Sequence, residues 1–135
     1  MKKPAVPWME RTEAARFAFI KGAIRSASTR YPPRYEVLAK AKRGKRINPA
    51  SGKMAEHYEC NICHELHPAK MVSTDHIEPV VPLTGFTDWH QVITRLFCPP
   101  DGLQILCKAC HAIKTKQENA ERKLHKNNNK AEPND

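Results

Sequence analysis

The sequence contains no long apolar segment. None of its stretches approaches the roughly 20 consecutive apolar residues that cross a bilayer. The N-terminal stretch MKKPAVPWMERTEAARF begins with two lysines but lacks the apolar run of about 7–15 residues found in a signal peptide. We therefore expect a cytoplasmic protein with no membrane partner. In a reducing compartment, its five cysteines favour metal ligation or free thiols over a disulfide framework.

Aromatic residues and glycines are also scarce. Aromatics make up 7% of the chain, and five glycines stand against eleven prolines. Because prolines fix corners, this composition predicts short elements rather than long uninterrupted ones. At 135 residues, the chain suits one compact domain whose small core would gain from local crosslinks. The few aromatics disfavour RNA binding, which uses aromatic side chains on a basic sheet to stack single-stranded bases.

Acidic residues are nearly missing from the first 55 positions. These positions hold 14 Lys or Arg against 3 Glu, whereas residues 56–135 hold 9 Lys or Arg against 11 Asp or Glu. A basic region of this kind favours a polyanionic partner, because each neutralised phosphate releases condensed counterions. The alternative is a basic surface that serves only solubility, and charge alone does not identify the polyanion.

Residues 1–55 predict a basic, mainly helical N-terminal region. Thr12 is suited to cap a helix that runs to about Ser28, with apolar residues at positions 17, 20 and 24. That helix could pack in a core, face nucleic acid, or do both. A short helix is expected over 35–43, and a flexible basic loop over 43–54, where Gly, Asn-Pro and Ser-Gly occur.

The remaining chain predicts alternating short strands and helices, and therefore an α+β fold. Strands are expected at KMVSTDH and LQILC, and helices at TDWHQVITRLF and KACHAIKTKQENAERKLHK. These elements define a core over residues 56–124. Residues 125–135 have almost nothing to bury and predict a disordered tail.

Four of the cysteines have the spacing of two zinc knuckles. Thiolates in two Cys-x-x-Cys pairs satisfy tetrahedral zinc, and the sequence offers Cys60, Cys63, Cys107 and Cys110. The 43 residues between the pairs make this a zinc site with a large insert. Alternatives are four unligated thiols, or replacement of one thiolate by His64 or His67. Cys98 lies outside both pairs and is expected to be a small buried apolar residue.

Between the knuckles, the stretch DHIEPVV places a carboxylate beside an imidazole at the end of a predicted strand. The stretches CNIC, DHIEPVV, DWHQVITRLF and LQILCKACHAIKT occur in an order similar to that of HNH endonucleases. Residues 56–120 thus resemble this family, particularly the small HNH proteins of tailed phages, and RSASTRYPPRY resembles the phage proteins more loosely. The resemblance implies a ββα-metal core, in which two strands and a helix surround a divalent ion.

The resemblance also implies roles for three residues. Asp75 and His111 would ligate a catalytic divalent ion, such as Mg²⁺ or Mn²⁺, and His76 would be the general base. An imidazole with a pKa of about 6.5 suits deprotonation of water near neutral pH. One carboxylate and one imidazole leave coordination positions for phosphate and water. The alternatives are that Asp75 only closes a turn and that His111 is an exposed helix residue.

One position departs from the family pattern. Where the family has Asn before the Leu-Gln pair, this sequence has Gly102. The Asn side chain would orient the loop that holds the general base, and glycine cannot do so. Asp101 is the candidate to replace this hydrogen bond, since Asp-Gly favours a tight turn.

The expected function is hydrolysis of DNA phosphodiester bonds, by nicking or by double-strand cleavage. Candidate contacts to duplex DNA are the basic residues Lys108, Lys114, Lys116, Arg43, Lys45 and Arg46. The helix lysines could instead pair with Glu118 and Glu121. The phage resemblance adds terminase or other packaging proteins as partners, in the cytoplasm of an infected bacterium. The alternative function is a non-catalytic, zinc-stabilised DNA-binding or packaging accessory protein.

Overall fold

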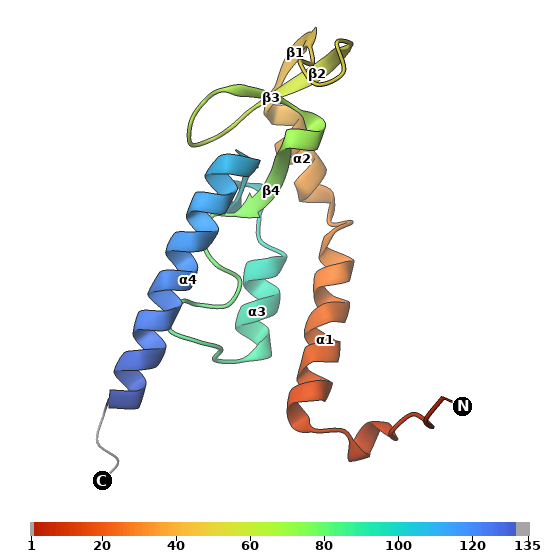
Figure 1. Cartoon of the computed structure of the whole chain (residues 1–135), viewed down its shortest axis with the longest axis vertical. Helices are drawn as coiled ribbons and strands as arrows, with labels where there is room; N and C mark the ends of the chain where they lie inside the picture. Colours follow the sequence, from red (N-terminus) through yellow and green to blue (C-terminus); the bar gives the residue numbers. More distant parts are fainter. Residues whose placement is uncertain (1, 132–135) are drawn as a thin grey trace. The chain divides into compact units, whose positions relative to one another are not determined.

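The computed structural model of the chain has an α+β fold, as the sequence predicts (Figure 1). It describes residues 2–131, whereas residue 1 and residues 132–135 lie outside the described part. The described part contains four α-helices and two small antiparallel sheets. It divides into two compact units between Tyr31 and Pro32. Residues 32–55, which the sequence analysis grouped with the basic N-terminal region, belong to the second unit.

The first unit consists of a short 3-10 helix, η1 (Trp8–Glu10), and α1 (Glu13–Ser28). The Thr12 side chain accepts a hydrogen bond from the backbone N–H of Ala15 at 3.1 Å, which confirms the predicted cap. The rings of Trp8 and Phe19 meet edge to face, with centroids 5.2 Å apart. This aromatic pair holds the lead segment against the helix.

The second unit begins with α2 (Pro32–Lys40), three residues earlier than the helix expected over 35–43. Proline is favourable in the first turn, because its missing N–H would have no helical partner there. The helix packs against the buried strand β5 (Leu103–Cys107) and the short 3-10 helix η3 (Pro100–Gly102).

A β-hairpin replaces the flexible loop expected over 43–54. Strand β1 (Lys42–Ile47) pairs antiparallel with β2 (Met54–Glu59), and β3 (Leu66–Pro68) extends this sheet. The Asn48 backbone N–H donates to the Lys53 carbonyl at 2.8 Å, and Gly52 adopts a φ of 70°. The Asn-Pro and Ser-Gly signals are therefore confined to a tight turn, and the residues beside the turn pair as strands. Gly44 lies within β1, with a φ of 98° where the register with β2 is irregular.

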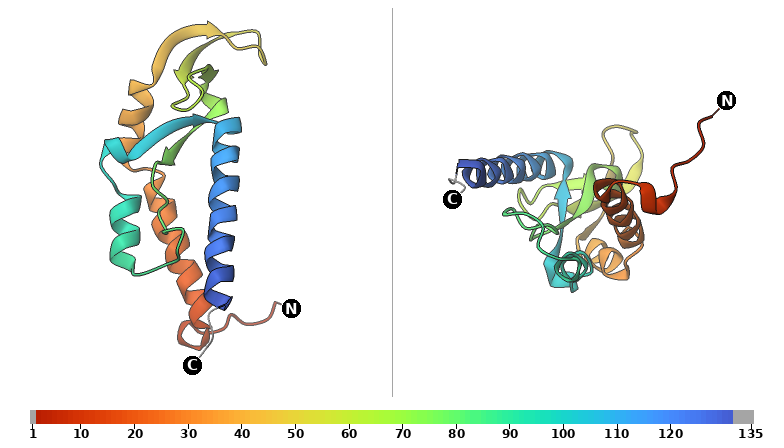
Figure 2. Two further views of the ribbon diagram at one scale, coloured as in Figure 1. Left: turned by 90° about the vertical axis from the view of Figure 1, so that its left-hand side faces the viewer. Right: turned by 90° about the horizontal axis from the view of Figure 1, so that it is seen from below.

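The strand–strand–helix order predicted for the second part of the chain is present, as two antiparallel strands and the helix that follows the second of them. Strand β4 (Val72–His76) pairs antiparallel with β5, so that Asp75 lies opposite Gln104. Helix α3 (Trp89–Leu96) lies between these strands in the chain and is capped by Asp88. Strand β5 leads directly into α4 (Lys108–Ala131), and their junction lies beside β4 (Figure 2).

The C-terminal helix is longer than expected. Residues 125–131, predicted to be part of a disordered tail, continue α4, and the rest of that tail lies outside the described residues. These residues are helical because a helix that is already nucleated extends at little free-energy cost, even through polar residues. None of the helices in the described range 2–131 is long and apolar enough to span a bilayer.

The core of the second unit surrounds its cysteines. Cys60, Leu106 and Cys107 are almost completely buried and form one cluster, against which Cys110 packs. Strand β5 is buried along its whole length. Cys60 and Cys107 therefore lie within the packed core, whereas Cys63 is exposed.

Candidate metal centres

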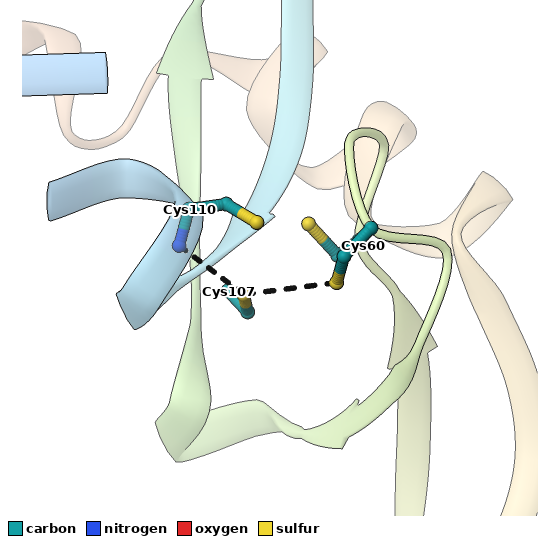
Figure 3. A group of neighbouring side chains, drawn as sticks. Cys60, Cys107 and Cys110 are labelled. Atoms are coloured by element: carbon teal, nitrogen blue, oxygen red, sulfur yellow. Dashed lines mark hydrogen bonds between the residues drawn. The ribbon is translucent and has the colours of Figure 1, made fainter. Parts of the chain in front are cut away.

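The four knuckle cysteines come together in one cluster. Their sulfur atoms all lie within 4.8 Å of one another, and Cys63 Sγ is 3.9 Å from Cys107 Sγ. Figure 3 shows the sulfurs of Cys60, Cys107 and Cys110 turned toward one another, with the Cys110 backbone N–H donating to Cys107 Sγ at 3.4 Å. The predicted pairing of two knuckles 43 residues apart in the sequence is thus confirmed as a four-thiol cluster.

The local backbone explains how the first knuckle closes. Cys60 follows β2 directly, and its N–H donates to the Glu65 carbonyl at 3.0 Å. The His64 N–H returns to the Cys60 carbonyl at 2.9 Å, and His64 adopts a left-handed φ of 61°. The second knuckle needs no such loop, because Cys107 ends β5 and Cys110 lies in the first turn of α4.

Without a cation among them, ionisation of all four thiols is unfavourable. Burial opposes the Cys60 thiolate, but backbone hydrogen bonds at Cys107, Cys63 and Ile62 lower its pKa to about 6. Hydrogen bonding with the Cys107 side chain is the main factor that raises the pKa of Cys110 to about 12. A cation among the sulfurs would favour the thiolate form of all four. The donor set therefore fits a structural Zn²⁺.

The other candidate zinc ligands lie around the cluster rather than in it. His64 Nδ1 is 3.7 Å from a Glu59 carboxylate oxygen, and His64 is not part of the four-cysteine group. His67 Nε2 is 4.0 Å from Cys63 Sγ and forms a separate group of possible ligands with Cys63 and Glu65. Cys98 is partly buried outside the cluster, and burial raises the pKa of its thiol.

Asp75 and His111, predicted to share a divalent ion, face each other. Asp75 ends β4 together with His76, and His111 lies in the first turn of α4. Asp75 Oδ1 is 3.6 Å from His111 Nε2. Two metal bonds of about 2.1 Å can bridge such a separation. The Asp75 side chain is 13% exposed and that of His111 is 44% exposed, so the pair opens to solvent on the helix side.

The second oxygen of Asp75 is already occupied by protein donors. Lys114 Nζ lies 2.8 Å from Asp75 Oδ2, and Gln104 Nε2 donates to the same oxygen at 3.0 Å. Lys114 also pairs with Glu118 at 2.7 Å and donates to the His76 carbonyl at 2.8 Å. Burial opposes the Lys114 ammonium, but Asp75 and Glu118 together raise its pKa. One carboxylate oxygen is thus pinned, and the other is left facing His111.

The His76 ring is oriented by a backbone carbonyl. Its Nε2 lies 2.9 Å from the carbonyl oxygen of Leu96, the last residue of α3. Because a carbonyl only accepts, this contact assigns the hydrogen to Nε2 and leaves Nδ1 with a lone pair. A neutral imidazole in this tautomer is able to take a proton at Nδ1.

The loop after His76 is held by three basic side chains that donate to its carbonyls. Lys114 bonds the His76 carbonyl, Arg95 bonds that of Pro79 at 2.9 Å, and Arg122 bonds that of Val81 at 3.0 Å. This role of Arg95 and Arg122 could not be predicted from the sequence, because the carbonyl of any residue can accept such a bond.

At Gly102, the connection to β4 is made by the backbone. The Ile77 N–H donates to the Gly102 carbonyl at 3.0 Å. A Cβ on Gly102 would lie 2.8 Å from Cys98 Sγ and 3.1 Å from Cys98 Cβ, so the Cys98 side chain occupies the space that a larger side chain at this position, such as Asn, would need. Asp101 is exposed beside it, and its loop-orienting role stays a prediction.

The candidate DNA contacts fall into two groups. Lys108 and Lys116 are exposed on α4, and Lys45 and Arg46 are exposed on β1. Lys114 and Arg43 are engaged within the protein instead. Lys114 bonds Asp75 and Glu118, as in the alternative of paired helix lysines. Arg43 bonds the carbonyls of Lys40 and Lys42 and lies 3.6 Å from Glu59, while remaining 42% exposed.

Two residues of the site were not predicted from the sequence. Gln104 bonds Asp75, and Asn61 Nδ2 donates to Gln104 Oε1 at 2.8 Å. Gln104 was available from the motif LQILC, but its role depends on the strand register, which pairs it with Asp75. Asn61 lies in the variable part of a knuckle, where the sequence pattern assigns no role.

Comparison with protein-family models, with curated proteins and with solved structures found no match to this chain. The site is therefore interpreted from its own geometry.

Proposed function

We propose that this protein is a metal-dependent DNA endonuclease of the HNH type, whose active site contains Asp75, His76 and His111. The observation that carries the proposal is the division of the Asp75 carboxylate: one oxygen is pinned by Lys114 and Gln104, and the other lies 3.6 Å from His111 Nε2. A carboxylate serving only to close a turn would have no need of an imidazole opposite its second oxygen.

In this proposal, Asp75 and His111 hold a Mg²⁺, a Mn²⁺ or another divalent ion. Bound there, the ion supplies Lewis-acid stabilisation of negative charge on the phosphorane and the departing 3′ oxygen. The two protein donors leave room for a phosphate oxygen and water, unlike the four-thiol cluster.

His76 performs the proton transfer. Its Nε2 hydrogen is committed to the Leu96 carbonyl, so Nδ1 accepts a proton from the attacking water. The water oxygen forms a bond to phosphorus, and the bond from phosphorus to the 3′ oxygen breaks. The departing 3′ oxygen takes a proton from solvent water, and His76 returns its proton to solvent. The products are a 5′-phosphate and a 3′-hydroxyl, as the HNH resemblance implies.

Duplex DNA is the proposed substrate because exposed basic residues occur on the helix that carries His111 and on the hairpin. Lys108 and Lys116 follow β5 on α4, and Lys45 and Arg46 project from the hairpin. Contacts from such side chains to phosphate position a duplex without reading its sequence. By the phage resemblance, the setting would be an infected bacterial cell, and packaging proteins such as the terminase would be partners.

A second function is favoured by the surroundings of Gly102. Cys98 fills the space of the family's Asn side chain, which would remove an element that orients the general base. A zinc-stabilised DNA-binding or packaging accessory protein with no catalysis would tolerate this change. The Leu96 carbonyl opposes it, because it orients His76 from a different element.

Nicking of supercoiled plasmid distinguishes the two functions. The full-length, zinc-loaded protein is incubated with Mg²⁺, with Mn²⁺, or without an added divalent ion. We expect divalent-dependent nicking that falls by about 10²–10⁴-fold in His76→Ala, the usual contribution of a general base. His90→Ala is the matched control, since His90 is an exposed histidine of α3, and it should nick like the wild type.

Absence of cleavage by the wild type under all conditions, together with zinc binding and duplex binding, would replace the endonuclease by the accessory function. Equal nicking by the wild type and His76→Ala would exclude His76 as the base.

A further inference from the structure

Gln104 links the two metal centres through its side-chain amide. It is 8% exposed, is the second residue of β5, and lies directly opposite Asp75 on β4. Its Nε2 donates to Asp75 Oδ2 at 3.0 Å, and its Oε1 accepts from Asn61 Nδ2 at 2.8 Å. Asn61 is the residue immediately after the zinc-ligand candidate Cys60.

The direction of these hydrogen bonds is fixed by chemistry. An ionised carboxylate can only accept, so Gln104 must present its NH₂ group to Asp75. If the amide turned over, its carbonyl oxygen would face the carboxylate oxygen, and both groups would lose their bond. The Asn61 NH₂ group supports the observed orientation, because it donates to the Gln104 carbonyl oxygen on the other side of the amide.

Asn61 is itself held by the strand that carries Gln104. Its backbone N–H donates to the Ile105 carbonyl at 2.8 Å, although the residue is exposed. The knuckle that begins at Cys60 therefore keeps the Asn61 side chain beside Gln104. A continuous series of bonds runs from the knuckle through Gln104 to the oxygen of Asp75 that does not face His111.

We infer that Asn61 is a positioning residue for the divalent-ion ligand Asp75, and that it acts through the amide of Gln104. The inference rests on the proposed function, since it requires that Asp75 and His111 bind a divalent ion. It assigns the zinc knuckle a role beyond folding: the knuckle supplies the donor that sets the orientation of the Gln104 amide. A residue that orients a metal ligand in this way affects the affinity of the site for the metal.

The test measures Mn²⁺ affinity by titration calorimetry on the full-length, zinc-loaded protein without DNA. Gln104→Leu is expected to weaken Mn²⁺ binding about 10- to 100-fold, the usual effect of losing a partner of a metal ligand. Asn61→Ala is expected to weaken it about 10-fold, at the low end of that range. If Asn61 acts through Gln104, adding Asn61→Ala to Gln104→Leu should change the affinity by less than about 2-fold.

Ile62→Ala is the matched control, because Ile62 is the next residue of the knuckle and its side chain is half exposed. It should retain zinc and bind Mn²⁺ like the wild type. A second measurement is the NMR signal of the Gln104 side-chain amide, which should shift in Asn61→Ala and stay in place in Ile62→Ala.

Three results would overturn the inference. If Mn²⁺ binding is lost in Asp75→Ala but unchanged in Asn61→Ala, the inference fails and the proposed metal site remains. The inference also fails alone if Ile62→Ala weakens binding as much as Asn61→Ala, because the knuckle would then act through general loosening. If the wild type binds no Mn²⁺ that depends on Asp75, the proposed site and the inference fail together.

Discussion

The two candidate metal centres share β5 and α4 but are built for different tasks. The four-thiol cluster is closed, with Cys60 and Cys107 buried and all four possible ligands contributed by the protein. The Asp75–His111 pair has only two facing donors, and the His111 side chain is 44% exposed. A closed centre binds a metal to hold the fold, whereas an open one leaves positions for other molecules.

The difference also shows how one centre depends on the other. Cys110 and His111 are neighbours in the first turn of α4, and successive helix residues point about 100° apart, so one faces the sulfurs and the other faces Asp75. An interaction that holds Cys110 in place also holds the first turn of α4, and it therefore holds His111 in place. The closed centre therefore positions the open one, through α4 on one side and through Gln104 on the other.

Loss of the closed centre should have the largest effect. Cys60→Ser is expected to unfold the second unit, because structural zinc supplies about 10–16 kcal/mol in small peptides, as much as the whole stability of many domains. Circular dichroism melting and bound-zinc content test this. Cys98→Ser, outside the cluster, should remain folded and retain zinc. A Cys60→Ser protein with wild-type melting and zinc content would contradict a structural role for the cluster.

Loss of the open centre should remove activity and leave the fold intact. We expect His111→Ala to reduce plasmid nicking by roughly 10³-fold, corresponding to several kcal/mol of lost stabilisation by the ion. Its melting temperature should change little, because the side chain is 44% exposed. His125→Ala, on the same helix, is the control and should nick normally. Unfolding of His111→Ala would remove the distinction between the two centres.

The sequence was sufficient to predict the closed centre and the strand–strand–helix order. Repeated Cys-x-x-Cys spacing is a local signal, and β5 and α3 follow apolar patterns that packing reinforces. The hairpin over 42–59 was not predicted, because turn residues mark a bend without showing whether the flanking residues pair.

Residue roles that depend on the register of paired strands also could not be predicted from the sequence. The placement of Asp75 opposite Gln104 requires knowing how β4 and β5 align, and the contact with Asn61 requires knowing where the knuckle lies on β5. Lys114 was predicted to contact DNA because it lies on the last helix and matches the Lys-Thr pair of the HNH resemblance, and its contact with Asp75 at 2.8 Å could not be predicted from that pattern. Long-range hydrogen bonds of this kind leave no periodic pattern in the chain.

Lys114 and Lys116 provide a smaller test of the open centre. Lys114→Ala should destabilise the protein by about 1–3 kcal/mol, because it removes a donor from the largely buried Asp75. It should not change the salt dependence of duplex binding.

Lys116→Ala should leave stability unchanged. It should lower the slope of log affinity against log salt concentration by about 0.9, the value for one phosphate contact. Denaturant unfolding and binding titrations at several salt concentrations measure both, and a lowered salt slope in Lys114→Ala would show that Lys114 contacts DNA.

The smallest effect is expected at Gly102, where the open centre departs from the family pattern. Gly102→Ala places a methyl group 2.8 Å from Cys98 Sγ, so the end of the Cys98 side chain must move. Overpacking of this kind costs about 1–3 kcal/mol. Cys98 lines an open pocket together with Ile77 and Thr94, so its thiol has room to move and the cost should be at the low end of that range. Combining Gly102→Ala with Cys98→Ala should recover most of the loss in denaturant unfolding, since the sulfur is then absent. If the double variant is no more stable than the sum of the single changes predicts, Cys98 is not what requires glycine at position 102.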